Sequence, residues 1–491
     1  MKINSIFTKN NQLKISILNS QYKHGDFKIC FSLIYSIQEI DGGIISKKVG
    51  RYYEIYSDQD EVIFTLQKPR IGSYNLSCGP EGLFVLGKNN QIIECKIEPL
   101  KFENPIPQIL YSDVHDKIFD PVIPLPNILK LEKETTPIKN LDFKISPDEK
   151  DFFKNFDNLL EVSDIKFNLS VGHSIVFNKQ NLKSEEYKIK INKDSISIDY
   201  SDYGGKFYSI ITLIQLINFY NTNLPLGLIE DKPNLNWRGM HLDCARQFYT
   251  IDEIKRLMDY MCFFKLNRFH WHLTDNEAWR VELECYPNLT KVGAFRGYNH
   301  VIPPFYGTGY SKTGGYYSRS QIKELIEYAR LRNIEIMPEI DLPAHSWTLL
   351  QIMPELSDSS SNIISEDVGN YTNNTINPAV EDTNIFLKNI LEELSEIFSF
   401  NIIHVGVDER PKDSWEGSPK VIEYMKKNNI ESFDELQDDY MNNIISILKN
   451  SKKLTAAWNE AALPPHNDIG SAGSGGKVDK NCIIFAWEHP D

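Results

Sequence analysis

Two adjacent carboxylic acids, Asp408 and Glu409, follow the apolar run 402–407 directly. Such a run predicts a buried strand, and successive side chains of a strand point to opposite faces. One acid can therefore reach the leaving group of a substrate while its neighbour contacts a different atom of the same molecule. The pair predicts proton-transfer chemistry at the end of a strand. The alternative is a pair of solvated acids that begins a loop.

The elements around this pair alternate between strand and helix from residue 237 onward, which is typical of parallel βα units. Six strands are predicted, at 238–243, 268–273, 334–340, 402–407, 454–458 and 482–487. Capping boxes predict where helices begin. In such a box a hydroxyl and a side chain three residues later satisfy free backbone N–H groups. These pairs are Thr250 and Glu253, Ser318 and Gln321, and Ser432 and Glu435.

Polar and aromatic residues stand at or just past the carboxyl ends of these strands, where the active sites of (β/α)8 barrels lie. They are Arg246, Asp275, Trp279, Asp341, His345, Asp408, Glu409, Trp458, Glu460 and Trp487. Indole faces stack on the CH faces of pyranose rings, and arginine and carboxylates bond to hydroxyl groups. The set therefore predicts a binding site for a sugar.

Two histidines of the second strand, His270 and His272, could with Asp275 bind a metal instead. Alternation along the strand puts both rings on one face, so we interpret them as part of the barrel interior. We expect neither a metal nor another cofactor. A metal-dependent hydrolase on a similar barrel is kept as an alternative.

The chain of 491 residues divides into three predicted domains. Short alternating runs in 1–120 predict a β-sandwich, and a proline-rich linker at 121–126 leads to an α+β domain at 127–232. Residues 233–491 predict a (β/α)8-type (TIM) barrel. Because closure needs eight strands and six are visible, we expect the barrel to be incomplete at the C-terminal side.

Composition excludes several classes of protein. The formal net charge of −14 opposes binding to nucleic acid or to anionic lipid. The N-terminus lacks the apolar core of a secretory signal, and no apolar run is long enough to cross a membrane, so we expect a cytoplasmic protein. Seven scattered cysteines without a CxxC spacing indicate neither a zinc site nor a disulfide framework.

Four motifs, in order along the chain, resemble those of glycoside hydrolase family 20, the β-N-acetylhexosaminidases and chitobiases. They are WRGMHLDCAR at 237–246, HWHLTD at 270–275 with Trp279-Arg280, PAH at 343–345 and HVGVDE at 404–409. The resemblance covers roughly residues 130–491. Residues 1–120 only weakly resemble the sandwich found at the N-terminus of chitobiases.

The resemblance implies an exo-acting hydrolase whose substrate is a chitooligosaccharide or a glycan with a terminal N-acetylhexosamine. The 2-acetamido oxygen of the substrate would attack C1, so the protein supplies no nucleophile. Asp408 would orient the acetamide, Glu409 would act as general acid and base, and His345 with Asp275 would support Glu409. The substrate-binding residues would be Arg246, Asp341, Trp458, Glu460 and Trp487.

Two departures from the family pattern matter. Val407 stands where the family usually carries Gly or Ala, so we expect the strand to be crowded before Asp408. The seventh strand of the family brings a Tyr to the acetamide and the eighth a Trp and a Glu, and none of these is found here. The alternative function is therefore a non-catalytic N-acetylhexosamine-binding protein. The sequence does not indicate an oligomeric state.

Overall fold

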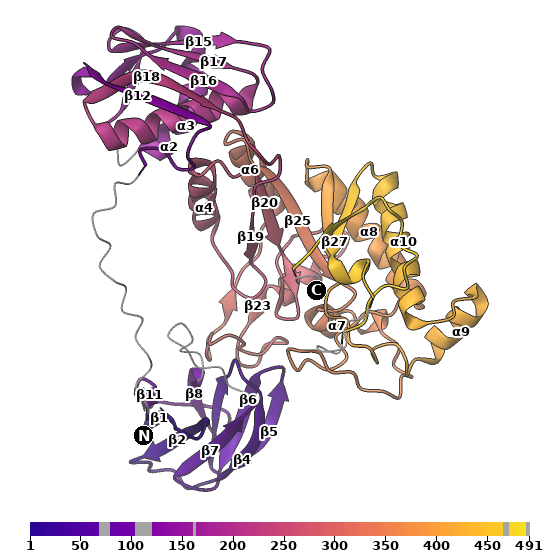
Figure 1. Ribbon diagram of the computed structural model, residues 1–491. Helices are drawn as coiled ribbons and strands as arrows, with labels where there is room; N and C mark the ends of the chain where they lie inside the picture. Colours follow the sequence, from indigo (N-terminus) through magenta and orange to yellow (C-terminus); the bar gives the residue numbers. More distant parts are fainter. Residues whose placement is uncertain (68–78, 104–119, 161–163, 465–470, 488–491) are drawn as a thin grey trace.

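The computed structural model describes residues 1–67, 79–103, 120–160, 164–464 and 471–487. A β-sandwich lies at one end of the molecule, an α+β unit at the other, and a parallel sheet with its helices between them (Figure 1). Segment 104–119 of the predicted sandwich domain lies outside the described residues. The architecture is multidomain with a TIM-like catalytic region, as predicted, and the domain boundaries stay a prediction.

The sandwich consists of two sheets whose inner faces share one apolar core. The first has the order β10-β1-β2-β7-β4, with β11 beside β1: Lys96–Ile97, Lys2–Phe7, Gln12–Leu18, Glu61–Leu66, Ile37–Asp41 and Lys101–Phe102. The second has the order β5-β6-β3-β8-β9: Gly43–Val49, Tyr52–Ser57, Phe27–Ser32, Glu81–Gly87 and Ile92–Ile93. Buried and half-buried side chains alternate along β1 and β2, which is the period of a strand with one face in the core.

The α+β unit has one mixed sheet covered by helix α3 (Tyr203–Tyr220). The sheet order is β12-β18-β16-β17-β15-β13-β14: Ile128–Pro137, Asn223–Asp231, Tyr187–Ile191, Ser195–Tyr200, His173–Lys179, Asp142–Lys144 and Lys166–Asn168. Short helices lie between β12 and β14: η1 (Lys139–Leu141), η2 (Pro147–Glu149), α1 (Lys150–Phe153), η3 (Lys154–Phe156) and α2 (Asp157–Leu160). The predicted hairpin is the pair β16 and β17, which run antiparallel.

The catalytic region is built on a parallel sheet with the order β19-β20-β25-β26-β27-β28. Its strands are Gly239–Asp243, Arg268–His272, Glu335–Leu342, Ile402–Gly406, Leu454–Trp458 and Cys482–Phe485, each within two residues of its predicted bounds. Its helices are α4 (Ile251–Phe263), α5 (Asn288–Gly293), α6 (Arg319–Arg330), α7 (Trp347–Ile352), α8 (Glu381–Ile397), α9 (Pro419–Asn428) and α10 (Phe433–Asn450). Short pieces are β21 (Thr274–Asp275), β22 (Ala278–Trp279), β23 (Phe295–Arg296), β24 (Thr313–Gly314), η4 (Pro354–Leu356) and η5 (Asn459–Ala461).

The capping signals set the start of three of these helices. Complete capping boxes begin α4 and α6, as predicted. At α10, Ser432 caps the helix by accepting from the N–H of Glu435, but the Glu435 carboxylate accepts from the N–H of Glu431 at 3.2 Å. The third box is therefore only half formed, because the carboxylate is closer to a neighbouring donor.

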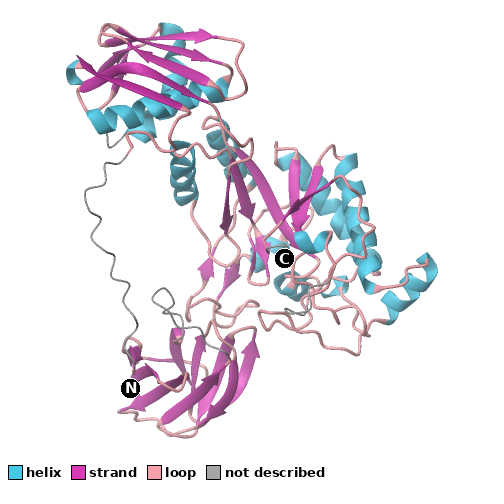
Figure 2. Cartoon of the chain, in the orientation of Figure 1, coloured by secondary structure: helices cyan, strands magenta, loops and turns pink. Residues whose placement is uncertain are grey.

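One apolar core runs through the α+β unit and the parallel sheet, so these two parts are packed as a single body. Long loops gather at the carboxyl ends of the parallel strands, on the side that faces the sandwich (Figure 2). The predicted site residues lie at that end. None of the helices in the described ranges has the length and apolarity needed to cross a membrane.

Candidate active site

The backbone that leaves β26 is left-handed at three positions, with φ of 70° at Gly406, 78° at Val407 and 49° at Glu409. A Cβ atom on Gly406 would lie 1.9 Å from Oδ1 of Asp341, so only glycine fits there. The left-handed conformation is rare for a β-branched residue and costs about 1–3 kcal/mol. Val407, which the sequence predicts to crowd the strand, is held there with its side chain fully buried. The strain lies where the two acids leave the strand.

Asp408 and Glu409 both face the imidazole of His345. Nε2 of His345 lies 3.6 Å from Oδ2 of Asp408 and 3.4 Å from Oε2 of Glu409. The two acid side chains are about one-fifth exposed, at 19% and 22%, whereas His345 is buried. Two neighbouring acids that share one buried ring partner, and that still reach solvent, can act on different atoms of one ligand.

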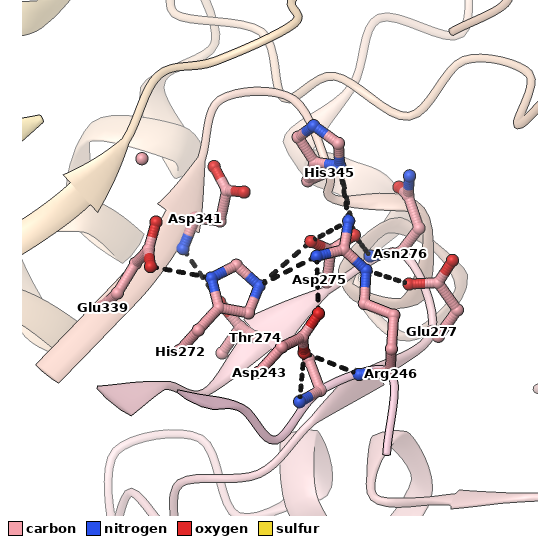
Figure 3. Close-up of polar contacts among 12 residues, drawn as sticks. Asp243, Arg246, His272, Thr274, Asp275, Asn276, Glu277, Glu339, Asp341 and His345 are labelled. Carbon is pink, nitrogen blue, oxygen red and sulfur yellow. Dashed lines mark hydrogen bonds and ion pairs between the residues drawn. The ribbon is translucent and has the colours of Figure 1, made fainter. Parts of the chain in front are cut away.

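A buried chain of alternating acids and histidines continues behind His345 (Figure 3). Nδ1 of His345 lies 3.1 Å from Oδ1 of Asp275, and Oδ2 of Asp275 lies 3.1 Å from Nε2 of His272. Nδ1 of His272 lies 2.8 Å from Oε2 of Glu339. Burial lowers the pKa of His345, but Asp275, Asp341 and Asp408 raise it by more, so it lies well above the ordinary value. His345 is therefore a cation at neutral pH.

Arg246 sits among three carboxylates rather than pointing freely into solvent (Figure 3). Its guanidinium lies 2.5 Å from Asp275, 3.0 Å from Asp243 and 3.0 Å from Glu277. Burial alone would raise the pKa of the Asp275 carboxyl. Arg246 and His345 lower this pKa by more, so it lies well below its ordinary value. Burial raises the pKa of Glu277 to about 7. Arg246 thus holds the loops after β19 and β20 together.

Asp341, predicted to bind substrate, lies behind Asp408. Its side chain is buried, and its backbone N–H donates to the hydroxyl of Thr274 at 3.0 Å. Burial and the neighbouring Asp408 raise the pKa of Asp341 well above its ordinary value, and burial raises the pKa of Asp408 as well, so the pair favours holding a proton. A neutral carboxylic acid can donate a hydrogen bond to its partner carboxylate. The structure therefore places Asp341 as support for Asp408.

Trp458 and Trp487, the two tryptophans predicted to bind substrate, lie on the inner side of the parallel sheet. Nε1 of Trp458 donates to Oε1 of Glu339 at 2.8 Å, and its ring stacks on His270 with centroids 5.5 Å apart. Nε1 of Trp487 donates to Oε2 of Glu460 at 3.0 Å. Trp458 therefore closes the end of the buried histidine chain. Glu460 is buried, while 45% of Trp487 is exposed and open to a ligand.

A cavity of about 180 Å³ opens beside Glu409. Its lining is mostly polar and comprises Arg51, Arg246, Asn276, Glu277, Tyr306, His345, Asp367, Val368, Gly369, Tyr371 and Glu409. Three of these, Glu409, His345 and Arg246, are predicted site residues. Most of the others come from loops between β20 and α8, and Arg51 comes from the sandwich.

Among the residues that the structure describes, side chains of the kinds that bind metals come together in four places. These are His241, His270 and Glu339; His272, Glu339 and Asp341; Asp275, Asp341 and His345; and His345, Asp408 and Glu409, with ligand atoms within 4.8 Å of one another in each group. Glu339 lies 2.8 Å from His270 and 3.2 Å from His404, which are distances of charge-assisted hydrogen bonds. At these distances the acids and histidines of such groups pair with one another through hydrogen bonds.

The structure brings Asp408, Glu409, His345, Asp275 and Arg246 into one cluster, as their positions at the strand ends predict. Three residues of this site were missed by sequence reasoning: Asp243, Glu277 and Tyr371, whose hydroxyl donates to Glu277 at 2.8 Å. Asp243 ends one predicted strand and Glu277 follows another, so the rule that located the other residues could have found them. Tyr371 lies in a long loop without such a signal.

Comparison with known proteins places most of the chain in one family. Residues 235–491 match the model of the glycosyl hydrolase family 20 catalytic domain, and residues 121–232 match domain 2 of the same family. A beta-hexosaminidase of Vibrio furnissii is 36% identical over 304 residues, which cover 61% of this chain and 48% of that protein. An N,N'-diacetylchitobiase of Vibrio harveyi is 32% identical over 262 residues, which cover 47% and 30%. The chain spans about half or less of the length of these curated relatives.

The fold of the whole chain also has a solved counterpart. The GH20 exo beta-N-acetylglucosaminidase of Vibrio harveyi, solved in complex with N-acetylglucosamine, superposes with a TM-score of 0.87 at 25% identity. The match covers 99% of this chain and 78% of that one, so it includes the sandwich. A β-N-acetylhexosaminidase of Bacteroides fragilis matches 74% of this chain with a TM-score of 0.60. From its motifs, its site and the family match, the chain belongs to glycoside hydrolase family 20.

Proposed function

We propose that this protein is an exo-β-N-acetylhexosaminidase that removes terminal N-acetylglucosamine or N-acetylgalactosamine from a glycan. The observation that carries the proposal is the pair Asp408 and Glu409, which share the partner His345 at the end of β26. The names of the relatives point to the same substrate class.

In the proposed reaction the 2-acetamido oxygen of the substrate attacks C1 and the bond to the leaving group breaks. Glu409 gives its proton to the bridging oxygen, and Asp408 orients the acetamide N–H and stabilises the positive charge of the oxazolinium ion. Glu409 then takes a proton from the water that opens this ion, so the anomeric configuration is retained. Oriented intramolecular attack reaches effective molarities of about 10⁵–10⁸ M, which makes positioning of the acetamide a main contribution.

The surrounding residues have supporting parts in this proposal. The His345 cation, held by Asp275, fixes the position of Glu409 between the substrate and the buried chain. Arg246 would bind sugar hydroxyls only by exchanging one of its three carboxylate partners, since its N–H groups face them. Trp487, with Glu460 at its indole N–H, offers a face to the sugar ring. Trp458 would wall the acetamide pocket.

The test is release of 4-nitrophenol from 4-nitrophenyl N-acetyl-β-glucosaminide and from its galacto epimer. We expect turnover by the wild type, inhibition by a thiazoline mimic of the oxazoline, and retention of configuration by NMR of the first product. Glu409→Gln keeps the size of the side chain and removes the acid, so kcat should fall by roughly 10²–10⁴-fold.

Two results would sink the proposal. One is turnover that Glu409→Gln leaves unchanged, because the proton would then come from another group. The other is saturable binding of N-acetylglucosamine by a wild type that hydrolyses neither substrate, which would select the non-catalytic binding protein.

A further inference from the structure

Arg410, the residue that follows the two acids, is a cation held inside the protein. The residue is fully buried. Its Nε donates to Oε1 of Gln437 on α10 at 2.7 Å, and a terminal N–H group donates to Oγ of Ser414 at 3.3 Å. Its guanidinium carbon lies 3.9 Å from the ring centroid of Trp415. These partners are all neutral, and no acid among the residues that the structure describes forms an ion pair with Arg410.

Burial of this charge is unfavourable, because a buried cation without an opposite charge beside it loses its hydration. Burial lowers the pKa of Arg410 to about 9, against the opposing effect of Asp434 and Glu416. The side chain is therefore still a cation at neutral pH. Its forked donors bind two segments of the chain at once, which an apolar side chain of the same length could not do.

The backbone of Arg410 is anchored as well. Its carbonyl accepts from the N–H of Ala472 at 2.7 Å. Gln437 extends the contact on the other side, because its Nε2 donates to the carbonyl of Glu460 at 3.0 Å. Arg410 is thus tied to α10, to the segment that contains Ala472 and, through Gln437, to the loop after β27.

The turn between β26 and Arg410 is the strained part of the site. Its backbone is left-handed at Gly406, Val407 and Glu409. A strained backbone persists only where the surrounding structure holds it in place. The pairing of β26 with β25 holds one side of the turn. On the other side, Arg410 is the first residue after the two acids that is buried. Arg410 therefore holds the end of the turn that carries Glu409.

We propose that Arg410 is a positioning residue, which keeps the Glu409 carboxyl within reach of the oxygen that it protonates. This inference rests on the proposed function, because that function makes Glu409 the acid. Nε2 of His345 holds the carboxyl from the side at 3.4 Å, and Arg410 holds the backbone from which the carboxyl extends. Without Arg410 the left-handed backbone at Glu409 relaxes, and the carboxyl moves with it.

The test depends on how much a leaving group needs the proton of Glu409. A 4-methoxyphenolate is a poor leaving group and needs this proton, whereas a 3,4-dinitrophenolate leaves without it. Arg410→Met keeps the length of the side chain and removes the charge and its hydrogen bonds. For this variant we expect kcat/KM on 4-methoxyphenyl N-acetyl-β-glucosaminide to fall by roughly 10–10²-fold, and on the 3,4-dinitrophenyl substrate by less than about threefold.

Arg332→Met is the matched control. Arg332 is also buried, and its guanidinium carbon lies 3.4 Å from the ring centroid of Tyr328. It pairs with Asp259 of α4 and precedes β25, at the end of the sheet away from the two acids. This variant loses a buried, ring-stacked arginine of the same kind, so its melting temperature should fall. The ratio of its kcat/KM values on the two substrates should equal that of the wild type.

Gln437→Leu is the second variant, and it serves if a thermal melt shows that Arg410→Met is unfolded. It removes the acceptor that holds Nε of Arg410 on α10. We expect the same selective loss on the 4-methoxyphenyl substrate, because Arg410 is then held less firmly.

Equal losses on the two substrates, or no loss on either, would overturn the inference, since a displaced acid must act through the leaving group. If the wild type cleaves neither substrate, the proposed function fails first. Crystal structures of the wild type and Arg410→Met then decide the inference separately. A Glu409 carboxyl that keeps its place beside His345 in the variant would exclude the positioning role.

Discussion

Replacement of Asp275 by asparagine tests the charge balance of the buried chain most directly. Asparagine keeps the shape of the side chain but leaves Arg246, His272 and His345 around a neutral amide. The substitution removes or weakens the ion pairs that Asp275 forms at 2.5 Å with Arg246 and at 3.1 Å with each histidine. Each hydrogen bond to a charged group contributes about 1.5–3 kcal/mol.

These contributions do not simply add, because Arg246 keeps Asp243 and Glu277 as partners. Removal of one member of a buried ion pair costs about 3–5 kcal/mol. We therefore expect Asp275→Asn to lower the free energy of unfolding by about 3–5 kcal/mol at pH 7. Activity should fall as well, since His345 loses the carboxylate that fixes its ring.

The pH dependence of this difference has a definite sign. The folded-state pKa of Asp275 lies well below its ordinary value. Its contribution to stability is therefore complete above about pH 4 and is lost as the pH falls through the folded-state value. The stability difference between the wild type and Asp275→Asn should be largest near neutral pH and should shrink below about pH 4.

The assay is urea unfolding followed by tryptophan fluorescence. All seven tryptophans lie at position 237 or beyond, so the signal reports on the catalytic region and not on the sandwich. Glu327→Gln is the control, because Glu327 pairs with Arg330 on the surface, and such pairs contribute only about 0–1 kcal/mol. A loss below about 1 kcal/mol for Asp275→Asn at pH 7, or a loss equally large at about pH 3, would refute the reasoning.

Three further predictions concern Gly406, the need for a metal and Asp358. Gly406→Ala would drive a Cβ atom into Asp341, and we expect kcat to fall by roughly 10²-fold; wild-type kcat would contradict the geometry. Strong chelator should leave hydrolysis unchanged, since the proposed reaction uses only carboxylates and the substrate amide; inactivation reversed by a divalent cation would favour a metallohydrolase. Burial alone would raise the pKa of Asp358. Hydrogen bonds from hydroxyls, including that of Ser418, lower this pKa by more, to about 2. Asp358→Asn should therefore lower the melting temperature above about pH 4 and converge with the wild type towards about pH 2.

Local sequence patterns are enough to predict most elements of the catalytic region. The strands follow from short runs rich in apolar residues, and α4 and α6 follow from capping boxes, all of which depend on neighbours in the chain. The predicted box at α10 is half formed because two backbone N–H groups compete for one carboxylate. Such competition depends on backbone geometry and not on residue spacing.

The site is predictable where a residue follows a strand. Asp408, Glu409, Asp275 and Arg246 obey this rule, because the carboxyl ends of parallel strands meet at one end of the sheet. The partners that each side chain has in the folded protein are not predictable in this way. The motif predicts that Arg246 binds sugar hydroxyls, and the structure surrounds it with three carboxylates from the ends of two neighbouring strands.

The sequence by itself determined the family, the order of strands and helices and the acids at 408 and 409, since each rests on short-range patterns. Only the tertiary structure decided that Tyr371 reaches Glu277 across 94 residues and that Arg51 reaches Val368 across 317. Contacts of this kind form when segments far apart in the chain pack together, and their energy comes from surfaces that no local pattern encodes. The sandwich therefore looks like an appendage in the sequence and forms part of the cavity wall in the folded chain.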